Sequence, residues 1–170
     1  MKLSVQKLVR AMRALKKTVK FFDTSALLAG YTLSINNINY ISTIVLSELE
    51  NIKTSYNRDD TVKYKARVLI RYLMDHQDLW QESSSNWRKI NRLMKHSPEL
   101  QDNNDSKLIC EAVLLARKTK ERIEFVTADS SQFFLACKFI TLLEPEYYRD
   151  TAHKERLWKG YKDIDFGSNE

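Results

Sequence analysis

Short apolar segments alternate with helical stretches along this chain, and that alternation restricts the fold more than any other feature. Four segments are rich in β-branched and aromatic residues and are typical of strands: residues 19–22, 40–45, 123–127 and 139–143. Residues 76–80 form a weaker fifth candidate. Helical patterns lie between them, the longest at 63–74 and 107–118. Strands that alternate with helices predict an α/β domain with a mostly parallel central sheet.

The composition excludes several other classes of protein. A chain of 170 residues with 43% hydrophobic and 29% charged residues is typical of one soluble domain rather than a disordered segment. Only 3 Gly and 2 Pro are present, which excludes collagen-like sequences and disfavours a small all-β sandwich. No apolar run approaches the roughly 20 residues of a membrane span. Two cysteines are too few for a disulfide scaffold, so we expect free thiols and an intracellular, cytoplasmic location.

The positive charge is concentrated at the N-terminus. Residues 1–20 carry seven Lys and Arg and no acid, whereas the remaining 150 residues sum to −1. We therefore predict three parts: a basic amphipathic arm (1–18), a central domain (19–146) and an aromatic and basic C-terminal extension (147–170). The arm could hold a polyanion, serve as a solvated packing helix, or act as a targeting or membrane-surface segment. The extension could stack nucleic-acid bases or anchor itself to the core.

Acidic residues stand at the ends of the predicted strands. Asp23 directly follows the first strand, Glu48 comes three residues after the second, and Asp129 comes two residues after the strand that ends at Thr127. Asp105 opens the helix at 107–118. Because the carboxyl ends of parallel strands meet at one edge of the sheet, these side chains should converge there.

Clustered carboxylates raise one another's pKa and destabilise a fold unless positive charge offsets them. Hard divalent cations with oxygen ligands, Mg²⁺ or Mn²⁺, are the natural partners, and one or two such ions can support hydrolysis of a phosphodiester. Each acid also has a plainer explanation as a helix cap, a turn residue or a solvated side chain. Asp102 competes with Asp105 for any functional role.

Four short motifs, in order, resemble those of PIN domains over about residues 18–143. They are FDTSALL (22–28), VLSELE (45–50), NDSKLI (104–109) and VTAD (126–129). Lys53 and Arg67 further resemble residues of the PIN domains attached to PhoH-like ATPases. These 170 residues contain no Walker A motif, so we do not expect the ATPase itself within them.

The resemblance implies a three-layer α/β/α fold and a Mg²⁺- or Mn²⁺-dependent nuclease that acts on RNA. By the same resemblance Asp23, Glu48, Asp105 and Asp129 are the catalytic metal ligands, and Thr24 and Thr127 support the site. Ser25 stands where many members have Asn. Ser130 and Ser131 follow Asp129 where many have another acid, which puts the second metal ion in question.

We therefore expect an endonucleolytic ribonuclease that cleaves single-stranded RNA. The basic residues predicted to hold the RNA are Lys16, Lys17, Lys20, Lys53, Arg67 and Lys107. Two alternatives stay open: a non-catalytic PIN-like module that binds RNA or protein, and a structure-specific DNA nuclease. The resemblance also leaves room for a homodimer and for an inhibitory or processing partner protein.

Overall fold

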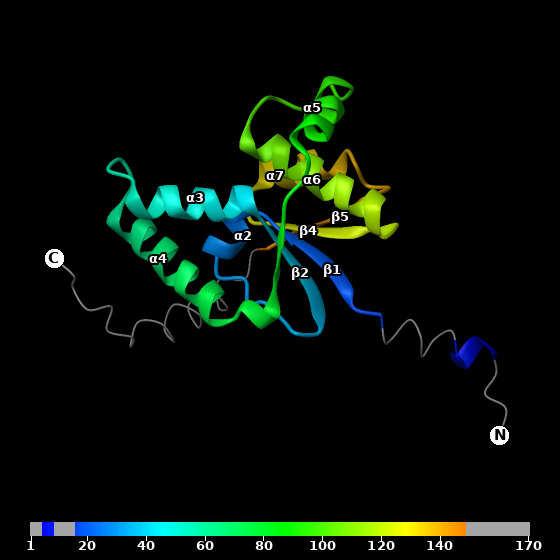
Figure 1. The fold of residues 1–170 in the computed structure, drawn as a ribbon, viewed down its shortest axis with the longest axis horizontal. Coiled ribbons are helices and arrows are strands. Elements are labelled where there is room, and N and C mark those ends of the chain that lie inside the picture. Colours follow the sequence, from blue (N-terminus) through cyan, green and yellow to red (C-terminus); the bar gives the residue numbers. More distant parts are fainter. Residues whose placement is uncertain (1–4, 9–15, 149–170) are drawn as a thin grey trace.

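A five-stranded sheet forms the centre of the computed structural model, which describes residues 5–8 and 16–148 (Figure 1). Its strands are β1 (Thr18–Phe22), β2 (Asn37–Ser42), β3 (Gln81–Ser83), β4 (Ile123–Thr127) and β5 (Leu143–Tyr147). Their order is β3-β2-β1-β4-β5, and every neighbouring pair is parallel. The predicted α/β fold with a mostly parallel sheet is therefore confirmed.

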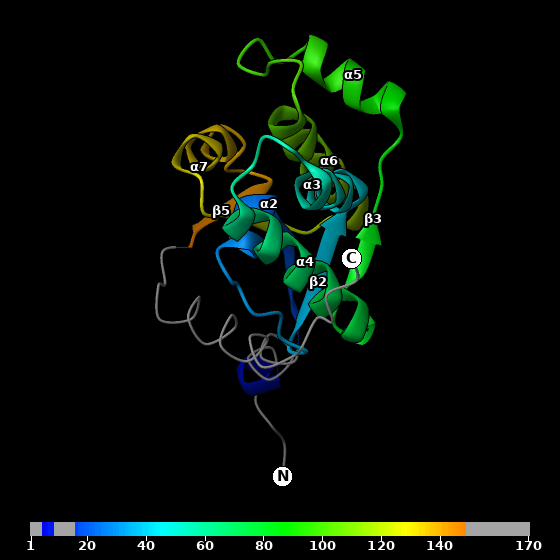
Figure 2. The ribbon, with the colours of Figure 1, turned by 90° about the vertical axis from the view of Figure 1, so that its left-hand side faces the viewer.

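Helices cover both faces of the sheet, as a parallel sheet requires. They are α2 (Thr24–Leu28), α3 (Thr43–Thr54), α4 (Asp60–Asp75), α5 (Trp87–Lys95), α6 (Asn104–Thr119) and α7 (Ser130–Cys137). In Figures 1 and 2, α2 and α4 lie on one side, where α3 packs against α4, and α5, α6 and α7 lie on the other. The three-layer α/β/α arrangement is confirmed.

The core is built around β1, the central strand. Phe21 and Phe22 point to opposite faces of the sheet, and both are fully buried. On one face Phe21 stacks on Phe125 of β4, with ring centroids 6.0 Å apart. Consecutive buried residues are expected in a strand that has helices over both of its faces. This packing fixes the carboxyl ends of β1 and β4 side by side.

Three predicted strands were misplaced. The strand predicted at 40–45 is β2, which ends at Ser42, and residues 43–45 already belong to α3 because Ser42 caps that helix. Residues 76–80 are not a strand: α4 ends at Asp75, a short 3₁₀ turn (η1, Gln77–Leu79) follows, and the indole of Trp80 donates a hydrogen bond of 2.8 Å to the Leu73 carbonyl. The edge strand β3 begins only at Gln81.

The last strand is shifted along the chain. Residues 139–142 form a turn, in which the N–H groups of Leu142 and Leu143 donate to the Phe139 carbonyl at 2.9 and 2.8 Å. β5 follows and includes Pro145, which an edge strand tolerates because one side of it needs no donor. Tyr147, which we assigned to the C-terminal extension, is the last residue of this strand.

Most of the predicted N-terminal arm and C-terminal extension lies outside the described residues. Among the helices that the structure does describe, none is long and apolar enough to cross a membrane.

Candidate active site

All four predicted acids line one pocket of about 450 Å³ at the carboxyl edge of the sheet. Asp23 comes from the β1–α2 junction, Glu48 from α3, Asp105 from the first turn of α6 and Asp129 from the β4–α7 junction. The strand order reverses between β1 and β4, and open parallel sheets form ligand sites at that position. The structure thus brings together acids that lie far apart in the sequence.

Asp23 is the buried acid of the pocket, with only 5% of the residue exposed. Its backbone N–H donates to the Val126 carbonyl at 2.9 Å, which ties it to β4. Its Oδ2 accepts hydrogen bonds from Ser25 Oγ at 2.7 Å and Thr127 Oγ1 at 2.8 Å. Although Asp23 precedes α2, its side chain does not cap that helix. The carboxylate is therefore held in place by hydroxyl groups rather than used as a helix cap.

The surroundings of Asp23 favour its protonated form when no cation is bound. Burial raises the pKa of its carboxyl group to about 6, and the charges of Asp105 and Glu48 act in the same direction. The hydrogen bonds from Ser25 and Thr127 oppose this rise in part. A buried acid with a raised pKa in a cleft is a frequent mark of a functional site.

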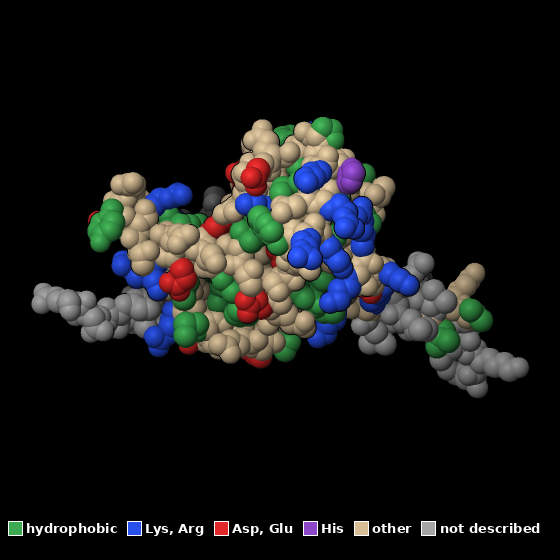
Figure 3. Space-filling model, turned by 45° about the horizontal axis from the view of Figure 1, so that its top comes forward, with side chains coloured by type: hydrophobic (Ala, Val, Ile, Leu, Met, Phe, Trp, Pro, Cys, Tyr) green, Lys and Arg blue, Asp and Glu red, His purple; other side chains and the backbone are tan. Residues whose placement is uncertain are grey.

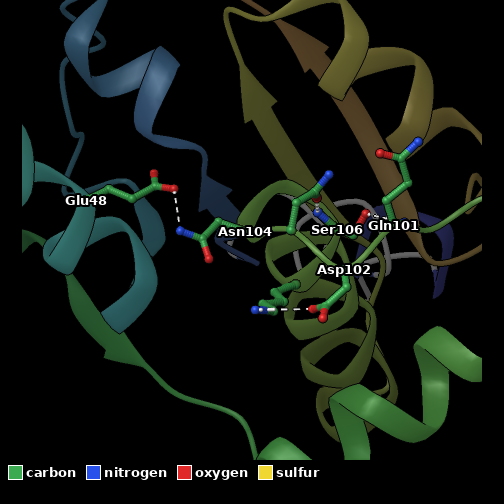
Figure 4. Close-up of polar contacts among 7 residues, drawn as sticks. Glu48, Gln101, Asp102, Asn104 and Ser106 are labelled. Atoms are coloured by element: carbon green, nitrogen blue, oxygen red, sulfur yellow. Dashed lines mark hydrogen bonds and ion pairs between the residues drawn. The ribbon is translucent and has the colours of Figure 1, made fainter.

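Glu48 is oriented by two neighbours that come from different elements. Its Oε2 accepts a hydrogen bond from Thr24 Oγ1. Its Oε1 accepts one of 3.1 Å from the amide of Asn104, which reaches across from the start of α6 (Figure 4). Thr24 was predicted to support the site. Asn104 was quoted in the third motif but was not recognised as a partner of Glu48.

Asp105 is free of the capping role that its position allows. Asn103 caps α6 by accepting a hydrogen bond from the Ser106 N–H at 2.9 Å. Partial burial of its carboxyl group, together with the charges of Glu48 and Asp129, raises the pKa of Asp105. Asp102, its competitor, is directed away from Glu48 and lies 3.4 Å from Lys107 Nζ (Figure 4).

Asp129 has a structural contact as well as a place in the pocket. Its Oδ1 caps α7 by accepting from the N–H groups of Ser131 at 2.8 Å and Gln132 at 3.2 Å. Its backbone N–H donates to Thr127 Oγ1 at 3.0 Å, so Thr127 contacts both Asp23 and Asp129. Asp129 is therefore a helix cap rather than only a turn residue, and its Oδ2 makes none of the helix-capping bonds.

The donor set of the pocket fits a divalent cation. Its acids supply hard carboxylate oxygens, the kind that Mg²⁺ and Mn²⁺ prefer. Among the described residues that line it, Arg58 carries the one positive charge. Within residues 5–8 and 16–148, however, no three acids, His or Cys lie close enough to hold one ion directly. Mg²⁺ keeps several waters and binds through one or two carboxylates, so a hydrated ion suits this spacing.

Lys16, Lys17 and Lys20, the N-terminal lysines predicted to hold RNA, do not line this pocket. Lys20 is buried, and its ammonium pairs with Glu124 at 2.7 Å and Glu146 at 2.8 Å, so two acids already neutralise the charge that was predicted to hold nucleic acid. Lys17 and Lys16 precede β1 and lie at the opposite edge of the sheet, about 20 Å from Asp23 at the usual strand rise. Lys16 also pairs with Glu121 at 2.9 Å.

The other predicted bases, Lys53, Arg67 and Lys107, do not line the pocket. Lys53 pairs with Glu50 at 2.7 Å, and Arg67 is exposed on α4. Lys107 lies 4.7 Å from the centre of the Trp87 ring. Arg58, in the turn before α4, lines the pocket and was missed, because nothing in a polar turn indicates which way it folds.

A fifth acid, Glu111, is buried in the middle of α6 and was also missed. Its two carboxylate oxygens accept hydrogen bonds from Ser42 Oγ at 2.6 Å and Ser83 Oγ at 2.9 Å. Burial raises its pKa, against the effect of these hydrogen bonds. Ser42 also caps α3 through the Ile44 N–H at 3.0 Å. Glu111 thus fixes the ends of β2 and β3 and the start of the helix that carries Glu48.

A parallel α/β/α domain with an acidic pocket at its topological switch point defines the class, and sequence comparison gives the family. The family model described as "PIN domain" matches residues 21–136, so this chain belongs to the PIN-domain family. PIN domains are generally metal-dependent nucleases. No curated protein sequence matches the chain significantly.

Two solved structures are similar to this chain at low sequence identity. One is a member of the VapBC family of toxin-antitoxin systems, VapBC-5, from Mycobacterium tuberculosis: identity is 15%, the TM-score is 0.51, and the match covers 77% of this chain and 99% of that one. The other is a domain of a functionally unknown protein from Methanocaldococcus jannaschii, at 20% identity and a TM-score of 0.48, covering 79% and 93%. The first supports the fold.

Proposed function

We propose that this protein is a Mg²⁺- or Mn²⁺-dependent endoribonuclease that hydrolyses phosphodiester bonds of single-stranded RNA. The observation that carries the proposal is the convergence of Asp23, Glu48, Asp105 and Asp129 in one pocket of a PIN domain. Such a concentration of negative charge would repel RNA unless a cation offsets it. The proposed products are a 5′-phosphate and a 3′-hydroxyl.

Asp23, Glu48, Asp105 and Asp129 would hold one or two divalent ions. When bound, such an ion supplies positive charge that stabilises the reacting phosphate and lowers the pKa of a water molecule. The protein's own part is to hold the oxygens ready: Ser25 and Thr127 fix Asp23, while Thr24 and Asn104 fix Glu48. Fixed ligands need less rearrangement when the substrate arrives.

Arg58 gives the pocket a way to bind the substrate phosphate. It lines the acidic pocket and lies in the turn between α3 and α4. A guanidinium presents paired N–H donors that match phosphate oxygens. We propose that Arg58 contacts the RNA backbone beside the cleaved bond.

A non-catalytic PIN-like module is the second candidate function. One observation favours it: in the described part of the chain, no three potential ligands are grouped closely enough to hold a common ion directly. A module without a metal site would show no Mn²⁺-dependent rise in melting temperature, because only a ligand that binds the folded state stabilises it.

The decisive experiment is incubation of the full chain with labelled single-stranded RNA and Mn²⁺. The wild type should cut the RNA, Asp23→Asn should not, and Asp102→Asn should match the wild type because Asp102 faces Lys107 instead of the pocket. Intact RNA at high protein concentration, with wild type and Asp23→Asn indistinguishable, would exclude the ribonuclease. DNA of the same sequence tests the DNA-nuclease alternative, since it lacks the 2′-hydroxyl.

The proposal extends to an inhibitory protein partner. The similar fold from Mycobacterium tuberculosis is described as part of a toxin-antitoxin system, which motivates this extension. A partner of this kind would place a Lys or Arg among the pocket acids and displace the cation. Homodimer formation stays a prediction, which size-exclusion chromatography with light scattering would test.

A further inference from the structure

A second and larger hollow lies away from the acidic pocket, on the other end of α6. It has a volume of about 890 Å³ and is bounded by the edge strand β3, the segment 84–86, the start of α5 and the C-terminal part of α6. We call it the basic groove, because Lys89, Arg117 and Lys118 line it, against one acid, Glu82. Hydroxyl and amide groups from Ser84, Ser85 and Asn86 complete its polar side.

The positive charge around the basic groove is dense and unpaired. Residues 87–95 carry four Lys and Arg and no acid, and residues 112–120 carry three and no acid. In Figure 3 the Lys and Arg side chains gather to the right of centre, over α5 and the C-terminal part of α6. No ion pair within 4.0 Å involves Lys89, Arg117 or Lys118 in the described chain.

Some basic residues outside the groove are neutralised by nearby acids instead. Lys20, Lys53 and Lys107 each lie within 3.4 Å of a carboxylate oxygen. Cations that gather on one face without carboxylate partners leave an electrostatic potential that attracts a polyanion. The three cations that line the basic groove therefore remain available to phosphate groups, because none of them pairs with an acid of the described residues.

α6 connects the basic groove to the acidic pocket. Asp105 lies in its first turn and Lys118 in its last, about 20 Å away at 1.5 Å per residue. Lys107, Leu114 and Lys118 recur at helical spacing and so share one face of α6. Lys107 also holds the half-exposed ring of Trp87 beside this route. An exposed aromatic ring between two phosphate-binding regions is a platform on which a base can stack.

We infer that the basic groove binds the backbone of a single-stranded RNA whose cleaved bond lies in the acidic pocket. This assignment rests on the proposed ribonuclease function for the identity of the strand. Lys89, Arg117 and Lys118 contact phosphates, and Trp87 stacks a base between the groove and the pocket. At about 3.4 Å per stacked nucleotide, a strand of roughly six nucleotides covers the ~20 Å between the two regions, within the range that single-strand-binding surfaces cover.

The test compares three charge reversals in the full chain: Lys89→Glu, Lys118→Glu and, as control, Lys138→Glu. Lys118 and Lys138 are both exposed at the C-terminal end of a helix, so the two reversals change net charge and helix-end electrostatics alike. Binding of a fluorescent 12-nucleotide RNA is measured by anisotropy in EDTA, so that no cleavage occurs. Circular dichroism melting checks that each variant folds.

At 50 mM salt the two groove variants should bind roughly tenfold more weakly than the wild type, and Lys138→Glu should bind like it. The salt dependence of the affinity should also fall by about 0.7 in log–log slope for each lost contact. Equal affinity and equal slope for Lys118→Glu and Lys138→Glu would overturn the groove assignment. Groove-dependent binding of poly-glutamate, without an effect on RNA, would overturn it in favour of an acidic protein segment.

The two proposals fail separately. Cleavage in Mn²⁺ with no groove effect on binding keeps the ribonuclease and removes the groove. Groove-dependent binding with no cleavage by the wild type keeps the groove and removes the ribonuclease.

Discussion

The two ends of α6 present opposite electrostatic surroundings. At its first turn, carboxylates from four elements face one another, and Asp23 is buried deeply enough that its pKa rises to about 6. At its last turn, Lys89, Arg117 and Lys118 line the basic groove, and Glu82 is the one acid among the lining residues. Carboxylates that are held close together, with raised pKa values, are typical of a catalytic site. Solvent-exposed cations without acidic partners are typical of a surface that binds a polyanion.

The largest expected effect separates these two roles. Asp23→Asn should reduce cleavage of single-stranded RNA by on the order of 10³-fold, because it removes a charged ligand from the pocket. The same variant should bind RNA in EDTA at least as tightly as the wild type, since one negative charge near the strand is lost. Measured together, rate and affinity show whether the pocket and the groove are independent. If Asp23→Asn lost RNA affinity as well as cleavage rate, the pocket and the groove would not have separate roles.

A smaller effect tests the residues that orient Glu48. Thr24→Val and Asn104→Ala each remove one hydrogen bond to its carboxylate, and we expect 10–100-fold losses in activity or Mn²⁺ affinity. Titration of Mn²⁺ against melting temperature measures the affinity. Ser106 lies in the same helical turn as Asn104, but its hydroxyl accepts a hydrogen bond from the Gln101 N–H and does not contact Glu48. Ser106→Ala is therefore the control and should leave the Mn²⁺ affinity close to that of the wild type.

The pH dependence of metal binding tests the charge of Asp23. Because its pKa in the metal-free protein is about 6, protons compete with the cation below that pH. Mn²⁺ affinity should therefore fall by about tenfold for each pH unit below 6, since one proton must be displaced. The measurement is the Mn²⁺-dependent melting temperature between pH 4.5 and 8. An affinity that does not change across pH 6 would show that Asp23 is not a ligand.

The same carboxyl group affects the stability of the metal-free protein. A raised pKa means that its contribution to stability is present below the ordinary pKa of 3.8 and is lost as the pH rises through about 6. Asp23→Asn should therefore be more stable than the wild type in EDTA at pH 8, by up to about 3 kcal/mol, with no such gain at pH 4. Urea unfolding at both pH values checks this. If the wild type were more stable than Asp23→Asn at pH 8, the raised pKa of Asp23 would be contradicted.

The smallest expected effect concerns Glu111, in the middle of α6 between the acidic pocket and the basic groove. Glu111→Ala leaves the hydroxyl groups of Ser42 and Ser83 without their acceptor and should cost about 2 kcal/mol of unfolding free energy. Glu111→Gln, which keeps an acceptor, should cost less. Urea unfolding gives the free energies. If the two variants were equally destabilised, the hydrogen bonds to the serines would not be the cause.

The acids of the site were predictable because their positions follow from topology alone. Asp23 and Asp129 come directly after strands, and the carboxyl ends of parallel strands always meet at one edge. Thr127 was predicted from the resemblance to PIN domains rather than from topology. Sequence periodicity placed the helix at 107–118 within a few residues of α6, because its apolar stripe is long.

The remaining features depended on distances between elements, which one sequence does not supply. Lys20 looked like part of a basic arm, but the register of β1 and β4 places it opposite Glu124. Glu111 was not singled out, because only the docking of α6 on the ends of β2 and β3 buries it. The basic groove went unpredicted because its lysines and arginines come from two helices that are separate in the chain.

The rigidity of α6 has a consequence for the products of the proposed reaction. A helix of 16 residues has a fixed length, so α6 keeps a constant distance between the acidic pocket, where RNA would be cleaved, and the basic groove, where it would be bound. Fragments longer than this interval would stay attached and be cut again, whereas shorter ones would lose the second contact and dissociate. The helix would then act as a molecular ruler, and the digest would accumulate oligonucleotides of one minimum size.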